Sequence, residues 1–241
     1  MIRAIRRTLP GTAALAATLA GTLLVALTAL GLVVLTSDRL QLLDNDVRDW
    51  VLAHQVPLLA YLLRGITHLG NAMVVVPIFV LLAGALSRVR ATAEPLISAL
   101  TAAGLLMVTV VLLKAVVGRP GPSSEPPGIW SGAWPSGHTA TSTVVYGLLA
   151  LMLWQHGGIR PDGPDRYPGS VLFAVPALLA LPVLIAIGLV YCNYHWFSDV
   201  VGGFLLGIPI AIAAQLLPRP LLRPPGAFPP PARPTASQNR S

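Results

Sequence analysis

His195 and Asp199 stand four residues apart in a segment that reads His-Trp-Phe-Ser-Asp. Residues with this spacing lie on one face of a helix, where a carboxylate accepts the Nδ1–H of an imidazole. Such a bond fixes the tautomer and leaves Nε2 free as a nucleophile or a base. The spacing therefore predicts a histidine–aspartate pair, although pairs of this kind also occur as purely structural contacts.

Pro135, Ser136, Gly137 and His138 form a second group, which we interpret as a turn that opens a helix. Ser136 is the expected N-cap. Free N–H groups at a helix start bind anions, and His138 would stand beside them as a proton donor. A capping turn with an interfacial histidine and no chemistry would have the same sequence.

Lys114 and Arg119 bring two cations to the same region. Each alone is explained by snorkelling towards lipid headgroups. Combined with two histidines, a carboxylate and a helix N-terminus, they predict a phosphate site. One histidine would attack phosphorus and the other would protonate the leaving oxygen. This chemistry needs no metal and no other cofactor, and we expect none.

The elements that carry these residues are strongly apolar. Of 241 residues, 54% are hydrophobic and 10% are charged. A soluble domain is about 25% charged, so the composition excludes a soluble globular domain and a disordered chain. A single cysteine excludes a disulfide scaffold and a cysteine-based metal or redox site.

Six continuous apolar segments predict membrane-spanning helices, because a span needs about 20 mostly apolar residues. Their continuity excludes barrel strands, so the predicted fold class is an all-α, six-helix transmembrane bundle. The first segment is too long for a signal peptide, and we expect it to be retained. The six ranges are 11–36, 69–87, 93–117, 138–154, 170–193 and 198–217.

The basic residues predict the orientation. Most of the 16 lysines and arginines fall on the face that carries both termini. The positive-inside rule places that face in the cytoplasm, and the three polar groups then face the outside. The net charge of +7 is thus a topology signal in a cell-membrane protein, and we expect no nucleic-acid partner.

Three other segments have expected roles. Residues 38–68 have helical apolar spacing around acids such as Asp44, which predicts amphipathic helix at the outer interface with a break at Pro57. We interpret it as an anchor; a lid over a lipid site is the alternative. Trp130 and Trp134 are expected to be interfacial anchors; contact with a lipid headgroup or tail at the mouth of the site is the alternative. The Pro/Arg-rich stretch 218–241 is expected to be a disordered cytoplasmic tail after a membrane domain of residues 1–217.

The three polar groups resemble the motifs of the type 2 phosphatidic acid phosphatase superfamily, which also contains vanadium haloperoxidases. The family pattern is Lys, six residues, Arg-Pro; then Pro-Ser-Gly-His; then Ser-Arg, five residues, His, three residues, Asp. The resemblance spans 110–210. Gly121 and Leu189 stand where the family has its two phosphate-binding arginines. Arg119, two residues from the first vacancy, is the candidate substitute.

The resemblance implies a mechanism. His195 would attack phosphorus to form a phosphohistidine, and Asp199 would orient and support it. His138 would protonate the leaving group and then activate water. The implied phosphate-binding set is Lys114, Arg119, Ser136 and the Gly137 backbone.

The predicted activity is metal-independent hydrolysis of a lipid or polyprenyl phosphate monoester or diphosphate. Phosphatidic acid, phosphatidylglycerol phosphate and undecaprenyl diphosphate all remain candidates, and the oligomeric state is open. The alternative is a non-catalytic lipid-phosphate-binding protein that keeps the fold, because both family arginines are missing. A haloperoxidase is disfavoured because the weakened phosphate grip would also weaken vanadate binding. A transporter is disfavoured because the ionisable residues gather at one end of the spans.

Overall fold

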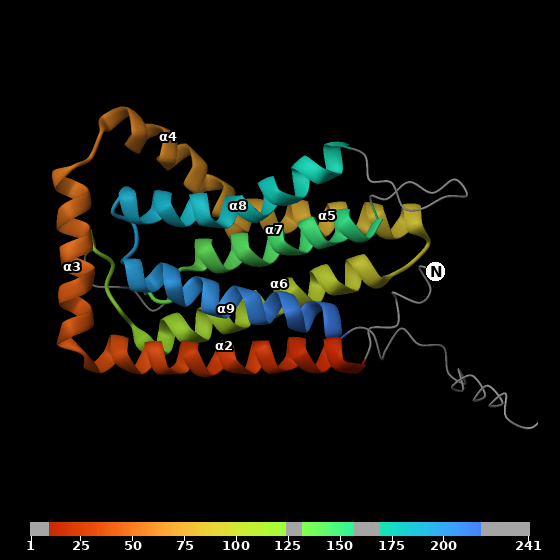
Figure 1. The fold of residues 1–241 in the computed structure, drawn as a ribbon, viewed down its shortest axis with the longest axis horizontal. Helices are drawn as coiled ribbons and strands as arrows, with labels where there is room; N and C mark the ends of the chain where they lie inside the picture. Colours follow the sequence, from red (N-terminus) through yellow and green to blue (C-terminus); the bar gives the residue numbers. More distant parts are fainter. Residues whose placement is uncertain (1–9, 124–131, 157–168, 218–241) are drawn as a thin grey trace, which may run out of the picture.

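The computed structural model describes residues 10–123, 132–156 and 169–217. Every regular element in these ranges is a helix (Figure 1), which confirms the predicted all-α fold class. A short 3₁₀ helix, η1 (His68–Gly70), joins two of the longer helices. The α-helices are α2 (Pro10–Thr36), α3 (Asp38–Ala53), α4 (Pro57–Thr67), α5 (Ala72–Arg90), α6 (Glu94–Val117), α7 (Gly137–His156), α8 (Gly169–Tyr191) and α9 (Phe197–Leu216).

Within the described ranges, the long helices α2, α5, α6, α7, α8 and α9 run side by side, and successive ones point in opposite directions (Figure 1). α2 begins and α9 ends at the same end of this bundle. α3 lies across the opposite end, and α4 slants back to pack on α8. The ends of α6 and α8 and the starts of α7 and α9 meet at the end that α3 crosses. All three polar groups of the sequence therefore lie at one end of the bundle.

Each of the six predicted spans is a helix, with ends that agree to within about three residues. In the described part of the chain, α2 from Thr12, α5, α6, α8 and α9 are long and apolar enough to cross a membrane. α7 falls short of that measure. Its Thr139, Ser142 and Val144 are fully buried. These buried hydroxyls are satisfied within α7 and its cap, because Thr139 donates to Ser136 Oγ and Ser142 donates to the carbonyl oxygen of Thr139.

Close packing of α7 on α9 depends on two glycines. A Cβ at Gly203 would lie 2.7 Å from Thr139 Cβ and 2.8 Å from the carbonyl oxygen of Ser136. A Cβ at Gly207 would lie 2.9 Å from the carbonyl oxygen of Ala140. Small residues four apart allow helix backbones to approach in membranes. They bring the turn that opens α7 directly against the first turns of α9.

Trp134 corrects one expectation. Its side chain is only 2% exposed, so it is not an interfacial anchor. Cβ atoms at Gly31 of α2 and Gly202 of α9 would come within 2.9 Å and 2.8 Å of its ring. The indole fills the space that these two glycines leave between the helices. Trp130 and the expected tail, 218–241, lie outside the described residues.

The amphipathic segment between the first two spans is helical, as predicted, and is broken where expected. α3 ends at Ala53, and α4 begins at Pro57, where proline is favoured in the first turn of a helix. Leu42, Leu43 and Trp50 of α3 are exposed, whereas Asp44 is buried. α3 thus carries apolar side chains on its outer faces and one acid towards the bundle.

Candidate active site

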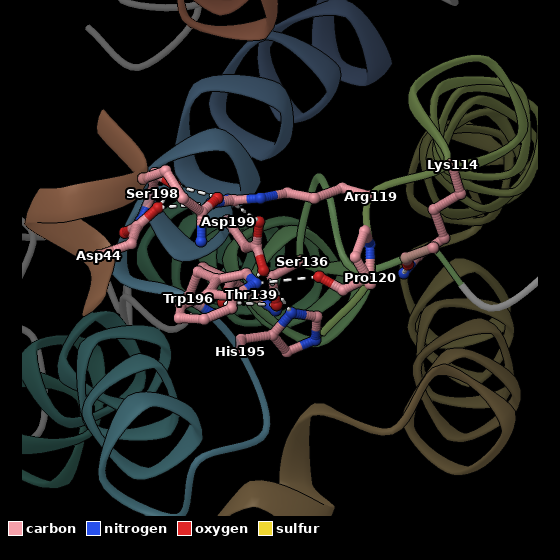
Figure 2. A network of polar contacts seen from close by, with 12 residues as sticks. Asp44, Lys114, Arg119, Pro120, Ser136, Thr139, His195, Trp196, Ser198 and Asp199 are labelled. Atoms are coloured by element: carbon pink, nitrogen blue, oxygen red, sulfur yellow. Dashed lines mark hydrogen bonds and ion pairs between the residues drawn. The ribbon is translucent and has the colours of Figure 1, made fainter. Parts of the chain in front are cut away.

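The histidine–aspartate pair forms where α9 begins. His195 Nδ1 lies 3.3 Å from Asp199 Oδ2, which confirms the predicted contact (Figure 2). The same oxygen accepts the N–H of Trp196, the residue before α9, at 3.0 Å. This is half of a capping box, so the local folding of the helix start fixes the carboxylate. His195 is held in turn by its own N–H, which donates to the carbonyl oxygen of Leu189.

The second oxygen of Asp199 is held by Arg119. Arg119 Nη1 donates to Asp199 Oδ1 at 2.7 Å, and Nη2 donates to Asp44 Oδ2 at 2.6 Å. Arg119 is 7% exposed, and both carboxylates are fully buried. The guanidinium also packs over the ring of Trp196. Figure 2 shows this network, which extends from α3 through the loop after α6 to α9.

Arg119 therefore holds two carboxylates on the side of Asp199 away from His195. The sequence suggested instead that Arg119 substitutes for the arginine that is absent at Gly121. In this structure both terminal nitrogens of Arg119 bind carboxylates. Phosphate binding by Arg119 therefore stays a prediction. The sequence missed this assignment because Asp44 lies 75 residues from Arg119 along the chain.

The turn before α7 is built as the sequence predicts. Ser136 Oγ accepts from the N–H of Thr139 at 3.3 Å, so Ser136 caps α7. Its own N–H donates to the carbonyl oxygen of Asp199 at 2.9 Å. The Ser136 side chain is fully buried and also accepts from the Thr139 hydroxyl. In this structure the serine orders the start of α7, and its expected contact with phosphate stays a prediction.

Lys114 lies against the same helix start. Its Nζ donates to the carbonyl oxygen of Gly132, and its Cε would lie 3.7 Å from a Cβ at Gly137. His138, on the first turn of α7, is within electrostatic range of Lys114 and His195. The structure thus brings together five expected residues around the N-terminus of α7: Lys114, Ser136, Gly137, His138 and His195.

His68 is a site neighbour that sequence reasoning missed. It lies within electrostatic range of His138. η1 packs directly on α7, because a Cβ at Gly70 would lie 3.1 Å from the carbonyl oxygen of His138. The Tyr146 hydroxyl also donates to the carbonyl oxygen of Leu69. No local spacing signalled this approach.

Asp44 is the second residue that sequence reasoning left without a role, and here a signal existed. It falls on the same helical face as Leu40, Val47 and Val51. An acid on an apolar face needs a buried partner, because burying an unpaired charge is costly. That partner is Arg119.

Leu189 occupies the second position at which the family arginine is absent. Its side chain is 1% exposed and belongs to the hydrophobic core. Its carbonyl oxygen accepts from the N–H groups of Tyr194 and His195. Position 189 therefore contributes through its backbone to the turn that carries His195, and its side chain faces away from solvent.

Comparison with known proteins identifies the class. Residues 95–221, more than half of the chain, match the PAP2 superfamily. The sequence is 29% identical over 161 residues to phosphatidylglycerophosphatase B of Bacillus subtilis (strain 168), covering 63% of this chain and 71% of that protein. The chain belongs to the PAP2 superfamily.

The fold agrees with that assignment. A crystal structure described as the first transmembrane PAP2 type phosphatidylglycerolphosphate phosphatase from Bacillus subtilis superposes with a TM-score of 0.69 at 22% identity. The match covers 85% of this chain and 98% of that one. Together with the apolar helices, it identifies an integral membrane protein.

Proposed function

We propose that this protein is a metal-independent lipid phosphate phosphatase that works through a phosphohistidine at His195. The observation that carries the proposal is the His195–Asp199 contact beside the N-terminus of α7. It joins a nucleophile, its orienting carboxylate and an anion-binding helix start at one end of spanning helices. Membership of the PAP2 superfamily supports this assignment.

The first step transfers the phosphoryl group to the protein. His195 Nε2 attacks phosphorus, the bond from phosphorus to the lipid oxygen breaks, and His138 gives its proton to that oxygen. Asp199 holds Nδ1–H and offsets the positive charge that forms on the ring. Lys114 and the backbone N–H groups at Gly137 hold the phosphoryl oxygens. Ser136 supports this group by capping the helix.

The second step releases phosphate. His138, now neutral, takes a proton from water, and the oxygen attacks phosphorus as the bond to His195 Nε2 breaks. The products are inorganic phosphate and the starting imidazole. His138 donates one proton in the first step and regains one from water in the second. The cycle therefore needs no other acid or base.

The substrate is an amphiphile whose phosphate reaches the end of the bundle. Phosphatidylglycerol phosphate is the first candidate, because a relative at 29% identity carries that activity in its name. Phosphatidic acid and polyprenyl phosphates or diphosphates present the same group at a membrane surface and belong in the same test. The charge distribution of the sequence supports cytoplasmic termini and a site that faces outside.

The test is phosphate release by the purified protein in detergent with EDTA, across these lipids. His195→Ala and His138→Ala are compared with the wild type. His54→Ala is the matched control, since His54 is exposed and bonds only locally to Trp50. Release that is lost in the first two variants and kept in the control supports the proposal. Wild-type release from His195→Ala contradicts it.

A non-catalytic lipid-phosphate binder remains the second candidate, favoured by two observations. Leu189 lies in the core, and Arg119 is engaged with carboxylates. In this structure the side chains at both of these positions are thus engaged elsewhere, and substitution by Arg119 stays a prediction. Folded protein that binds phospholipid but releases no phosphate from any lipid would select this function.

A further inference from the structure

We infer that Asp44, on the helix that crosses the end of the bundle, is a positioning residue that holds Asp199 and thereby His195 for phosphoryl transfer. The inference rests on the proposed function and adds a residue from outside the matched region, which begins at residue 95. Asp44 belongs to α3, which the sequence indicated only as an interfacial anchor or a lid.

The first argument is the geometry of the guanidinium. Asp199 Oδ1 and Asp44 Oδ2 bind different terminal nitrogens of Arg119, at 2.7 Å and 2.6 Å. A guanidinium is a rigid planar fork, so two anchored nitrogens fix its position and orientation. With Asp44 in place, Arg119 presents one fixed donor to Asp199. Without it, Nη2 keeps only the longer, uncharged 3.3 Å bond to Gln41 Oε1, and the charged anchor on that side of the guanidinium is lost.

The second argument is that Asp44 also accepts a hydrogen bond from the backbone next to Asp199. The N–H of Ser198, in the first turn of α9, donates to Asp44 Oδ1 at 3.0 Å. The Ser198 hydroxyl donates to Asp44 Oδ2 at 2.5 Å and accepts from Arg119 Nη1. A carboxylate at a helix N-terminus is favourable because free N–H groups point at it. Asp44 thus acts on Asp199 both through the side chain of Arg119 and through the helix start.

The third argument is charge. Two buried carboxylates share one arginine, so this group holds one surplus negative charge beside His195. His195 gains positive charge as its Nε2 bonds to phosphorus, and a preorganised negative charge in a dry site stabilises that change. Other charged or titratable groups near the histidines are Lys114, His138 and His68. All of these are cationic or neutral, so the surplus comes from the Asp44–Arg119–Asp199 group.

This arrangement gives α3 a part in the reaction. Figure 2 shows Asp44 reaching from α3 to Ser198 and Arg119. The exposed Leu42, Leu43 and Trp50 on the same helix suit a membrane surface. The Asp44–Arg119–Asp199 group is therefore complete only when α3 lies across the bundle.

The test is a single-turnover measurement with protein in excess over a radiolabelled lipid phosphate, comparing wild type with Asp44→Asn. At saturating protein, the first-order rate constant does not depend on the fraction of inactive molecules. A purely structural role for Asp44 would raise only the protein concentration needed for half-saturation. A positioning role lowers the plateau rate constant, by about 10- to 100-fold, the usual cost of losing an orienting partner.

Asp49→Asn is the matched control, because Asp49 lies on the same helix with an exposed side chain. It should leave the plateau and the half-saturation concentration unchanged. If Asp44→Asn does not fold, Ser198→Ala removes the hydroxyl link alone and should lower the plateau by a smaller factor. A wild-type plateau in the folded Asp44→Asn protein, or in Ser198→Ala when Asp44→Asn is unfolded, overturns the inference. A wild-type protein that never turns over overturns the proposed function as well.

Discussion

The N–H of Ser136 donates a 2.9 Å hydrogen bond to the carbonyl oxygen of Asp199. This bond joins the turn that opens α7 to the first turn of α9, although the two residues are far apart in the chain. The start of α7, proposed to bind phosphate, and the carboxylate that contacts His195 are consequently held in one frame. Ser136 and Asp199 are fully buried, so the relative position of the proposed nucleophile and the proposed phosphate-binding groups is set before a substrate arrives.

Replacing His138 should have an effect that depends on the leaving group. A lipid alkoxide needs a proton as it leaves, whereas 4-nitrophenolate does not, because it is a far weaker base. His138→Ala should therefore lose turnover of lipid phosphate but still form phosphoprotein from 4-nitrophenyl phosphate. That phosphoprotein should accumulate, because water activation is also impaired. Rapid-quench labelling measures it, and equal loss with both substrates would remove the proton-donor role.

The α7–α9 contact should be intolerant of a single methyl group. A Cβ at Gly203 would lie 2.7 Å from Thr139 Cβ, so Gly203→Ala should destabilise the protein by about 1–3 kcal/mol through overpacking. Activity should fall as well, since Ser136 and Thr139 would shift. Gly104→Ala is the control, because nothing lies within 4 Å of its added Cβ. Thermal unfolding in detergent compares them; equal midpoints would show that the close approach is not required.

Introducing arginine at the two positions that lack the family arginines should have opposite effects, improving substrate binding at one and destabilising the fold at the other. Gly121 is half-buried and follows Pro120, whose carbonyl oxygen accepts from Trp196 Nε1. Gly121→Arg should therefore fold and lower KM by adding a charge-assisted phosphate contact. Leu189 is 1% exposed in the core. Leu189→Arg should therefore lower the unfolding midpoint sharply, because it buries an unpaired charge. Steady-state kinetics and unfolding curves test the pair, and a stable, more active Leu189→Arg would contradict this account.

The proposed orientation of the protein in the membrane predicts which introduced cysteines react with a membrane-impermeant maleimide in intact cells. Cys192, the only cysteine, is first replaced by serine. A cysteine at Asp49, exposed on α3 at the site end, should then be labelled from outside. A cysteine at Ala91, exposed after α5 at the opposite end, should be labelled only after permeabilisation. The reverse pattern would place the site in the cytoplasm.

Local features of the site were accessible to sequence reasoning, because they depend on spacing within one helix start. The four-residue step from His195 to Asp199 became a contact, and the expected helix cap at Ser136 is formed by its bond from the N–H of Thr139. The apolar runs likewise located the helices, since a membrane span is defined by length and composition.

Long-range pairing was not accessible in the same way. Arg119 stands close to Lys114 in the sequence, yet its guanidinium is bound by Asp44 and Asp199, which are 75 and 80 residues distant. Trp134 is of a residue type that often anchors proteins at membrane interfaces. In the structure its ring instead packs between Gly31 and Gly202, which lie on separate helices. Such contacts are decided by how helices pack. A single sequence shows them only indirectly, as in the acid on the apolar face of α3.

The most direct measurement is the location of the phosphoryl group during turnover. The protein would be quenched in alkali during hydrolysis of radiolabelled phosphatidylglycerol phosphate, and the labelled peptide identified by mass spectrometry. The account predicts an acid-labile, alkali-stable label on His195 that is absent from His195→Ala. Turnover of the wild type without that label, or a label that persists in His195→Ala, would contradict it.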